Sequence, residues 1–189
     1  YIAYGHYEFY IALGYKGLEL KKYFIKKRFP IKIKINLIDT GKKTMTGGRL
    51  RRLGKYLDET FLMTYGDGLS NVNLNKLINF HKKNKKTFTL TAVRPPARFG
   101  VIKINGNYVN YFKEKNNLDE GWINGGFFVI EPKILEYLKN DQTFLEREPF
   151  EKLTKKKELV AYKHDGFWQC MDTLRDKEIL EKKLNEQNN

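Results

Sequence analysis

The stretch FLMTYGDGLSNVNLNKLINFHKKNKKTFTLTAV, residues 61–93, contains two apolar runs separated by a polar, periodic segment. Residues 61–65 and 87–93 are rich in β-branched and aromatic side chains, which favours strands. Residues 74–84 repeat their apolar positions with a helical period. Because strands that alternate with helices form sheets covered on both faces, this stretch predicts an α/β fold with a mostly parallel, mixed sheet flanked by helices.

The same alternation continues on both sides of this stretch. Upstream, we expect a helical turn closed by Gly5, strands at 9–13 and 31–38, and helices at 18–28 and 49–57. Downstream, we expect a hairpin turning at Asn105-Gly106, a strand at 122–130, a helix opened by Pro132 and a last helix at 174–184. The hairpin predicts a small β-rich addition to the sheet. At 189 residues, the chain is predicted to form a single domain over residues 1–189.

Composition narrows the classes of partner. The 36 Lys and Arg residues against 22 Asp and Glu give a formal charge of +14, which favours nucleic acid, a membrane surface or phosphate-bearing small molecules. Lysine runs at 82–86 and 155–157 are typical of a solvated face. One cysteine excludes an internal disulfide, and three scattered histidines argue against zinc. Without a long apolar stretch or leader, a cytoplasmic location is expected.

Asp67 stands between Gly66 and Gly68, directly after the run at 61–65. Ligands of open α/β sheets collect beyond the carboxyl ends of strands, and Mg²⁺ typically takes one or two carboxylates together with substrate phosphates. We therefore predict that Asp67 binds magnesium and that the glycines let phosphates approach. The alternative is an ordinary turn.

Asp172 in FWQCMDT is the natural second carboxylate, and we expect it to lie close enough to Asp67 to share one metal ion. The alternative is that Asp172 or Thr173 caps the final helix, with Asp176 completing a capping box.

In MTGGRL, residues 45–50, two glycines and Arg49 stand at the entry to a helix, which suits a phosphate or a base carbonyl. A flexible loop is the alternative there.

Taken in order, GYKG, DTG, MTGGRL, TYGDG, RFG, EK, INGGFF and GFWQCMDT resemble the sugar-1-phosphate nucleotidyltransferase family. The resemblance spans nearly the whole chain from Gly14. Within the family, these motifs are most similar to the cytidylyl branch, the glucose-1-phosphate cytidylyltransferases. It implies a Rossmann-like core with a sugar-binding half. It also implies that CTP and glucose 1-phosphate react, with magnesium as cofactor, to give CDP-glucose and pyrophosphate for deoxysugar and surface-polysaccharide synthesis, including lipopolysaccharide O-antigen.

The resemblance also implies roles for individual residues. Asp67 and Asp172 match the magnesium-binding carboxylates. Glu114 and Lys115 match an acid that holds sugar hydroxyls and a catalytic lysine that meets the sugar phosphate. The glucose-contacting backbone corresponds to Gly100, Asn124, Gly125 and Gly126. The nucleotide-binding stretch corresponds to Thr40, Gly47, Gly48 and Arg49, with Gly66 beside the metal.

Three departures from the family pattern bear on activity. The glycine-rich signature that cradles the triphosphate is absent, so we expect an N-terminally incomplete chain that is inactive alone. The segment between Phe24 and Asp39 is shorter than usual, and Asn116 and Cys170 replace prolines. The sequence does not decide whether the protein forms a homo-oligomer. Two other classes remain as alternatives: an inactive remnant that acts as a binding or scaffolding protein, and a basic nucleic-acid-binding domain, against which the acidic Asp67, Glu114 and Asp172 argue.

Overall fold

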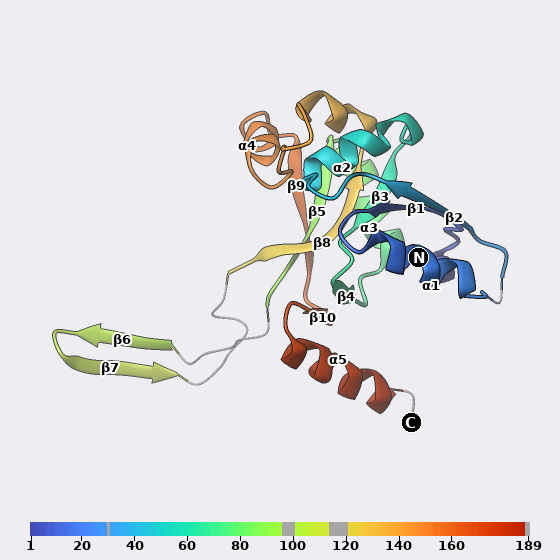
Figure 1. Ribbon diagram of the computed structural model, residues 1–189. Helices are drawn as coiled ribbons and strands as arrows, with labels where there is room; N and C mark the ends of the chain where they lie inside the picture. Colours follow the sequence, from blue (N-terminus) through green and yellow to red (C-terminus); the bar gives the residue numbers. More distant parts are fainter. Residues whose placement is uncertain (30, 96–100, 114–120, 188–189) are drawn as a thin grey trace. The chain divides into compact units, whose positions relative to one another are not determined.

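The computed structural model describes residues 1–29, 31–95, 101–113 and 121–187 (Figure 1). The strands are β1 (Glu8–Leu13), β2 (Lys34–Asp39), β3 (Phe61–Thr64), β4 (Gly68–Ser70), β5 (Phe88–Val93), β6 (Val101–Asn105), β7 (Tyr108–Lys113), β8 (Ile123–Ile130), β9 (Leu159–His164) and β10 (Trp168–Cys170). The α-helices are α1 (Gly17–Lys26), α2 (Thr46–Leu53), α3 (Leu74–Asn84), α4 (Glu148–Lys155) and α5 (Leu174–Gln187). The 3-10 helices are η1 (Ile2–Tyr4), η2 (Gly54–Tyr56) and η3 (Pro132–Tyr137).

The strands form a mixed set of sheets, as expected for an α/β fold. A four-stranded sheet has the order β3-β8-β5-β9, and β1 pairs with β2 in parallel. Two further pairs are antiparallel, β4 with β10 and β6 with β7. The two strands of the opening stretch, β3 and β5, are therefore not neighbours, because β8 from much later in the chain is hydrogen-bonded between them.

Contacts within the chain cluster in two compact units. The first unit comprises Tyr1–Leu62, Leu74–Thr89 and Val129–Val160, and the second comprises Met63–Asn73, Leu90–Phe128 and Ala161–Asn189. The prediction of one domain over residues 1–189 stays a prediction.

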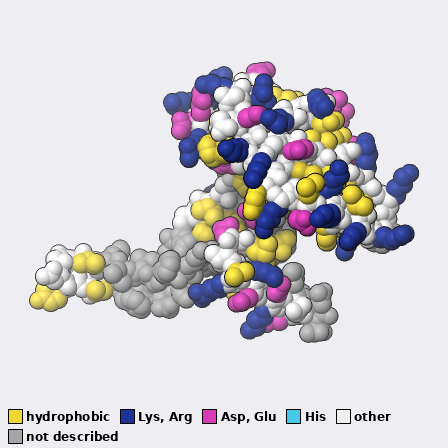
Figure 2. All heavy atoms as spheres, viewed as in Figure 1, with side chains coloured by type: hydrophobic (Ala, Val, Ile, Leu, Met, Phe, Trp, Pro, Cys, Tyr) yellow, Lys and Arg dark blue, Asp and Glu magenta, His cyan; other side chains and the backbone are white. Residues whose placement is uncertain are grey.

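Each unit has its own apolar core. In the first unit, Phe88 is fully buried and meets the ring of Phe150 edge to face at a centroid distance of 5.1 Å. In the second unit, the buried Phe128 meets Tyr65 in the same way, also at 5.1 Å. Such aromatic pairs add to the stabilisation from apolar burial. On the face drawn in Figure 2, Lys and Arg side chains are scattered over the surface with acidic groups between them.

Several predicted boundaries are confirmed and others shift. The helix at 74–84 is α3, and Gly5 closes η1 with a left-handed φ of 86°. The helix expected at 49–57 was placed too late, because α2 already begins at Thr46 and gives way to a 3-10 turn after Leu53. The strand expected from residue 31 begins at Lys34. The hairpin loop is Gly106-Asn107, one residue later than predicted, since Asn105 pairs with Tyr108.

Gly48 allows α2 to pack against the turn at 140–143. The Gly48 N–H donates to the Thr143 carbonyl at 3.1 Å, and a Cβ on Gly48 would overlap the backbone of Asp141. We therefore expect Gly48→Ala to lower the free energy of unfolding by about 1 to 3 kcal/mol, the usual cost of overpacking. Urea denaturation measures this. Gly121→Ala is the control, because its Cβ would enter open space; equal stability of Gly48→Ala and the parent would contradict the packing role.

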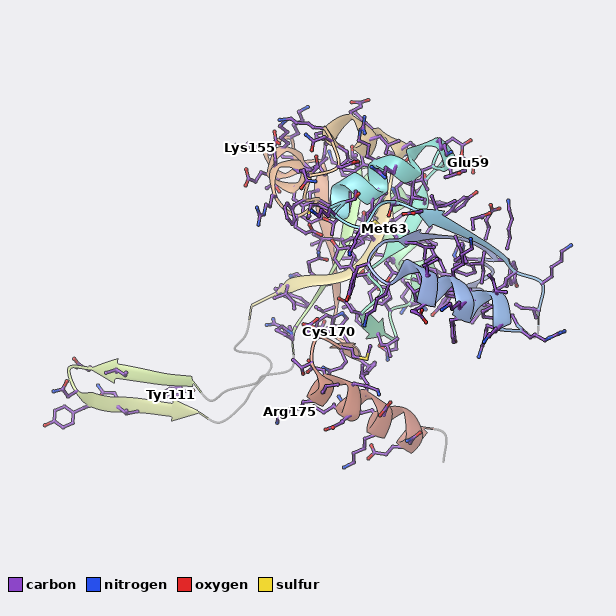
Figure 3. All side chains as sticks on the ribbon, in the orientation of Figure 1. Glu59, Met63, Tyr111, Lys155, Cys170 and Arg175 are labelled. Atoms are coloured by element: carbon purple, nitrogen blue, oxygen red, sulfur yellow. The ribbon has the colours of Figure 1, made fainter. Side chains whose placement is uncertain are left out.

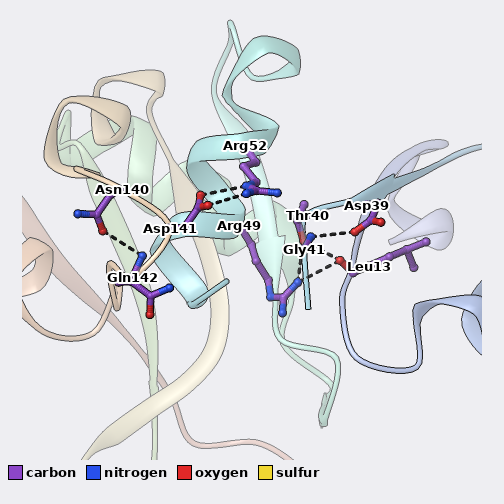
Figure 4. A network of polar contacts seen from close by, with 9 residues as sticks. All are labelled: Leu13, Asp39, Thr40, Gly41, Arg49, Arg52, Asn140, Asp141 and Gln142. Carbon is purple, nitrogen blue, oxygen red and sulfur yellow. Dashed lines mark hydrogen bonds and ion pairs between the residues drawn. The ribbon is translucent and has the colours of Figure 1, made fainter. Parts of the chain in front are cut away.

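Asp141 also pairs with Arg52 of α2, through bonds of 2.9 Å from Nε and 2.5 Å from Nη2 (Figure 4). The Arg52 hydrogen bonds hold the pKa of Asp141 below its ordinary value of 3.8. A depressed pKa in the folded state means that the pair stabilises the fold above pH 3.8 and that this contribution is lost as the pH falls through the lower folded pKa.

Asp141→Asn is accordingly expected to be less stable than the parent near neutral pH and to converge on it in acid. Urea midpoints measured between about pH 7 and about pH 2 test this, with the exposed Asp58→Asn as the charge control. A constant difference between Asp141→Asn and the parent over that range would show that the Asp141 charge contributes nothing.

Candidate active site

Asp67 and Asp172 are brought together by the antiparallel pairing of β4 with β10. Gly68 lies opposite Cys170 in the register, and one step further the Met171 N–H donates to the Asp67 carbonyl at 2.8 Å. Both aspartates line one cleft of about 700 Å³ in the second unit. The two residues thus line the same cleft although they lie far apart in the sequence, and their sharing of one metal ion stays a prediction.

The start of α5 leaves the Asp172 carboxylate available. The Thr173 backbone N–H and hydroxyl donate to Asp176 Oδ2 at 3.0 and 2.8 Å, and the Asp176 N–H donates back to Thr173 Oγ1 at 3.2 Å. This is a capping box with Thr173 as the cap and a buried Asp176. The Cys170 thiol donates a weak bond to Asp172 Oδ2 at 3.4 Å. The capping alternative therefore applies to Thr173 and not to Asp172.

The segment Asn124, Gly125 and Gly126 lies on β8 and also lines the cleft. β8 runs through both glycines, in agreement with the strand predicted at 122–130. Gly125 is needed because a Cβ would come within 2.7 Å of Val93 Cγ1, and Gly126 has a φ of 76° that favours glycine. The Gly126 N–H donates to Asn124 Oδ1 at 3.0 Å.

Trp168 fixes this segment from β10. Its indole N–H donates to the Gly125 carbonyl at 2.8 Å, and its side chain lines the cleft beside Asn124. Sequence reasoning did not single out Trp168. The one signal in the sequence was the tryptophan itself, because a buried indole N–H requires a hydrogen-bond partner. Which residue is the partner depends on the pairing of distant strands.

The predicted nucleotide-binding residues Thr40, Gly47, Gly48 and Arg49 lie in the first unit. Figure 4 shows Thr40 and Arg49 among them. Arg49 donates from Nη1 to Thr40 Oγ1 at 2.7 Å and to the Leu13 carbonyl at 3.0 Å. Thr40 is fully buried and donates to the same carbonyl at 2.8 Å. The glycines lie within α2, so the flexible-loop alternative is wrong. Since the Gly48 N–H is bonded to Thr143, it is not a spare donor for phosphate.

Of the remaining predicted site residues, one is described by the structure and three are not. Gly66 is exposed, and a Cβ there would meet nothing within 4 Å, which is the open backbone expected beside Asp67. Gly100, Glu114 and Lys115 lie outside the described residues. Their roles stay predictions.

The cleft suits a magnesium ion that arrives with its substrate. Among the described residues, no three His, Cys, Asp or Glu side chains gather into a ready metal cage. Asp67 and Asp172 supply two hard carboxylates on the cleft wall, and Mg²⁺ commonly uses one or two such ligands and completes its shell with water and substrate phosphates. The donor set therefore fits a magnesium ion whose remaining ligands are water and phosphate oxygens.

Comparison with solved structures shows the class of fold. The chain superimposes with a TM-score of 0.72 on HddC from Yersinia pseudotuberculosis, at 21% identity over 94% of this chain and 79% of that one. It superimposes with a TM-score of 0.71 on a UDP-glucose pyrophosphorylase complexed with UDP-glucose, at 15% identity over 97% and 82% of the two chains. The fold is thus the Rossmann-like α/β fold of nucleotidyltransferases.

Sequence comparison shows the family. Residues 8–180 match the nucleotidyl transferase family. The chain is 42% identical to the glucose-1-phosphate cytidylyltransferase of Salmonella typhimurium over 96% of its own length and 79% of that protein's. It is 39% identical to a probable glucose-1-phosphate cytidylyltransferase of Bacillus subtilis, over 92% and 76%. The chain therefore belongs to the nucleotidyl transferase family, a family of enzymes.

No helix in the described part of the chain is long and apolar enough to cross a membrane.

Proposed function

We propose that the protein transfers a cytidylyl group from CTP to glucose 1-phosphate and releases CDP-glucose and pyrophosphate. The observation that carries this proposal is the 42% identity to the Salmonella cytidylyltransferase over 96% of the chain. The two-carboxylate cleft supports it independently, because a triphosphate requires a divalent cation and a place to bind it. In this proposal the reaction takes place in the cytoplasm, and CDP-glucose serves the synthesis of deoxysugars and surface polysaccharides such as the O-antigen.

The reaction requires no covalent nucleophile on the protein. A phosphate oxygen of glucose 1-phosphate forms a bond to the α-phosphorus of CTP, while the bond from that phosphorus to the oxygen bridging to the β-phosphate breaks and pyrophosphate leaves. Catalysis of such a displacement is mainly alignment and neutralisation of charge. Asp67 and Asp172 would hold Mg²⁺, which when bound neutralises charge on the phosphate oxygens. Lys115 would neutralise the sugar phosphate.

The other proposed roles concern positioning. The backbone of residues 124–126 would contact the glucose, held in place by the Trp168 bond to the Gly125 carbonyl. Gly100 and Glu114 would add sugar contacts. Thr40, Gly47 and Arg49 would orient the nucleotide, and Gly48 would act by allowing α2 to pack closely. Gly66 would leave the backbone beside Asp67 open to phosphates.

A product assay tests the proposal. The protein expressed from its own gene is incubated with CTP, glucose 1-phosphate and Mg²⁺, and CDP-glucose and pyrophosphate are quantified together. We expect both products in equal amounts and neither when the sugar phosphate or the metal is left out. Hydrolysis of CTP without CDP-glucose, or no reaction with this pair of substrates, would contradict the proposed function.

A further inference from the structure

Arg175 has no explained role in the fold, yet it lies on the wall of the cleft. It belongs to the first turn of α5 (Figure 3), three residues after Asp172. It lines the cleft together with Asp67 and Asp172. Among the described residues that line this cleft, Arg175 is the one Lys or Arg. Its side chain is exposed.

The position is electrostatically unfavourable for a cation. The N-terminal end of a helix carries a partial positive charge, so a basic residue in the first turn is destabilised there, whereas an acidic residue would be stabilised. Asp176, the acid in the same turn, is occupied by the Thr173 capping box. The Arg175 side chain makes no hydrogen bond or ion pair with any residue that the structure describes.

Lys177, two residues further along α5, shows the contrast. Its ammonium pairs with Glu181 at 3.5 Å on the exposed side of the helix, an ordinary i,i+4 pair. Lys177 does not line the cleft. Lys177 is thus matched by a neighbour on its own helix, whereas Arg175 faces a cleft whose other charged groups are carboxylates.

We propose that Arg175 binds a phosphate group of a substrate in this cleft. The guanidinium presents donors in a planar fork that matches phosphate oxygens bidentately, and it is more easily desolvated than an ammonium. A Mg²⁺ ion balances the two carboxylates, but a substrate with several phosphate charges leaves further negative charge in the cleft, which a guanidinium on the cleft wall would offset. This inference rests on the proposed function, and the phosphate could belong either to CTP or to glucose 1-phosphate.

Steady-state kinetics of Arg175→Gln and Arg175→Lys, measured with each substrate varied in turn, test the inference. A charge-assisted bond is worth about 1.5 to 3 kcal/mol, so we expect Arg175→Gln to lose about tenfold or more in kcat/KM, with the rise in KM confined to the substrate whose phosphate it holds. Arg175→Lys should recover part of the loss. Lys177→Gln, which removes the same charge from the same helix, should match the parent.

A change of less than about twofold in Arg175→Gln, or an equal loss in Lys177→Gln, would overturn the inference. If the protein expressed from its own gene makes no CDP-glucose, the proposed function fails, and calorimetric binding of inorganic tripolyphosphate and of glucose 1-phosphate with Mg²⁺ then decides the role of Arg175. Weaker binding of either probe by Arg175→Gln but not by Lys177→Gln would support it. Equal binding of both probes by all three proteins would overturn it.

Discussion

Asp67→Asn is expected to lower magnesium-dependent formation of CDP-glucose by on the order of 100-fold or more, with little change in folding. The substitution keeps the shape of the side chain and removes its charge, and Mg²⁺ depends on anionic oxygen ligands. Asp67 is exposed on the cleft wall and supports the fold through its backbone carbonyl, which accepts from the Met171 N–H. Turnover at saturating CTP, with Mg²⁺ varied, measures the effect.

The matched control is Asp165→Asn. Asp165 is also an exposed aspartate of the second unit, but it does not line the cleft. It should keep the activity of the parent, since only the total charge changes. Normal magnesium-dependent turnover in Asp67→Asn would rule out a metal-ligand role for this carboxylate, and a comparable loss in Asp165→Asn would indicate an effect of net charge.

CTP is expected to be preferred over UTP and dTTP by about 10- to 100-fold in kcat/KM. Cytosine presents an exocyclic amine where the other two bases present a carbonyl, and mispairing a buried polar group costs about 1 to 3 kcal/mol. The resemblance of residues 45–50 to the cytidylyl branch motivates this prediction, and the identity to two relatives named as cytidylyltransferases supports it.

Competition among the three nucleotides in one reaction mixture, with the three sugar nucleotides separated and quantified, gives the ratio directly. Parallel single-substrate reactions control for differences in nucleotide purity. Equal rates would leave the family assignment intact and remove the cytidylyl specificity from the proposal.

The regular elements of the fold were predictable where local signals agree with the tertiary structure. α3 has helical periodicity over its whole length, and Gly5 closes η1 with the left-handed conformation that glycine adopts without cost. The strands β4 and β10 escaped prediction because each has only three residues, and their stability comes from pairing with each other across the chain. No local pattern of so few residues distinguishes a strand from a loop.

The candidate site was also predictable only in part, because some of its residues are placed by contacts with distant parts of the chain. Asp67 and Asp172 each follow an apolar or aromatic segment, which suggested their approach, whereas the antiparallel pairing of β4 with β10 that brings them to one cleft has no local signal. The packing of Gly48 against Asp141 depends on the turn at 140–143, which has no link to MTGGRL in the sequence. Arg175 was not singled out, because an arginine in a helical turn is unremarkable until the cleft beside it and the capping role of Asp176 are known.

The most direct test of a shared magnesium site is the activity of the double variant Asp67→Asn, Asp172→Asn, measured beside both single variants. Residues that act as one unit give strongly non-additive losses. If the two carboxylates hold one metal ion, each single variant should lose on the order of 100-fold or more, and the double variant should fall little further. Two independent losses that multiply in the double variant, or a single variant with parental activity, would contradict a metal shared by Asp67 and Asp172.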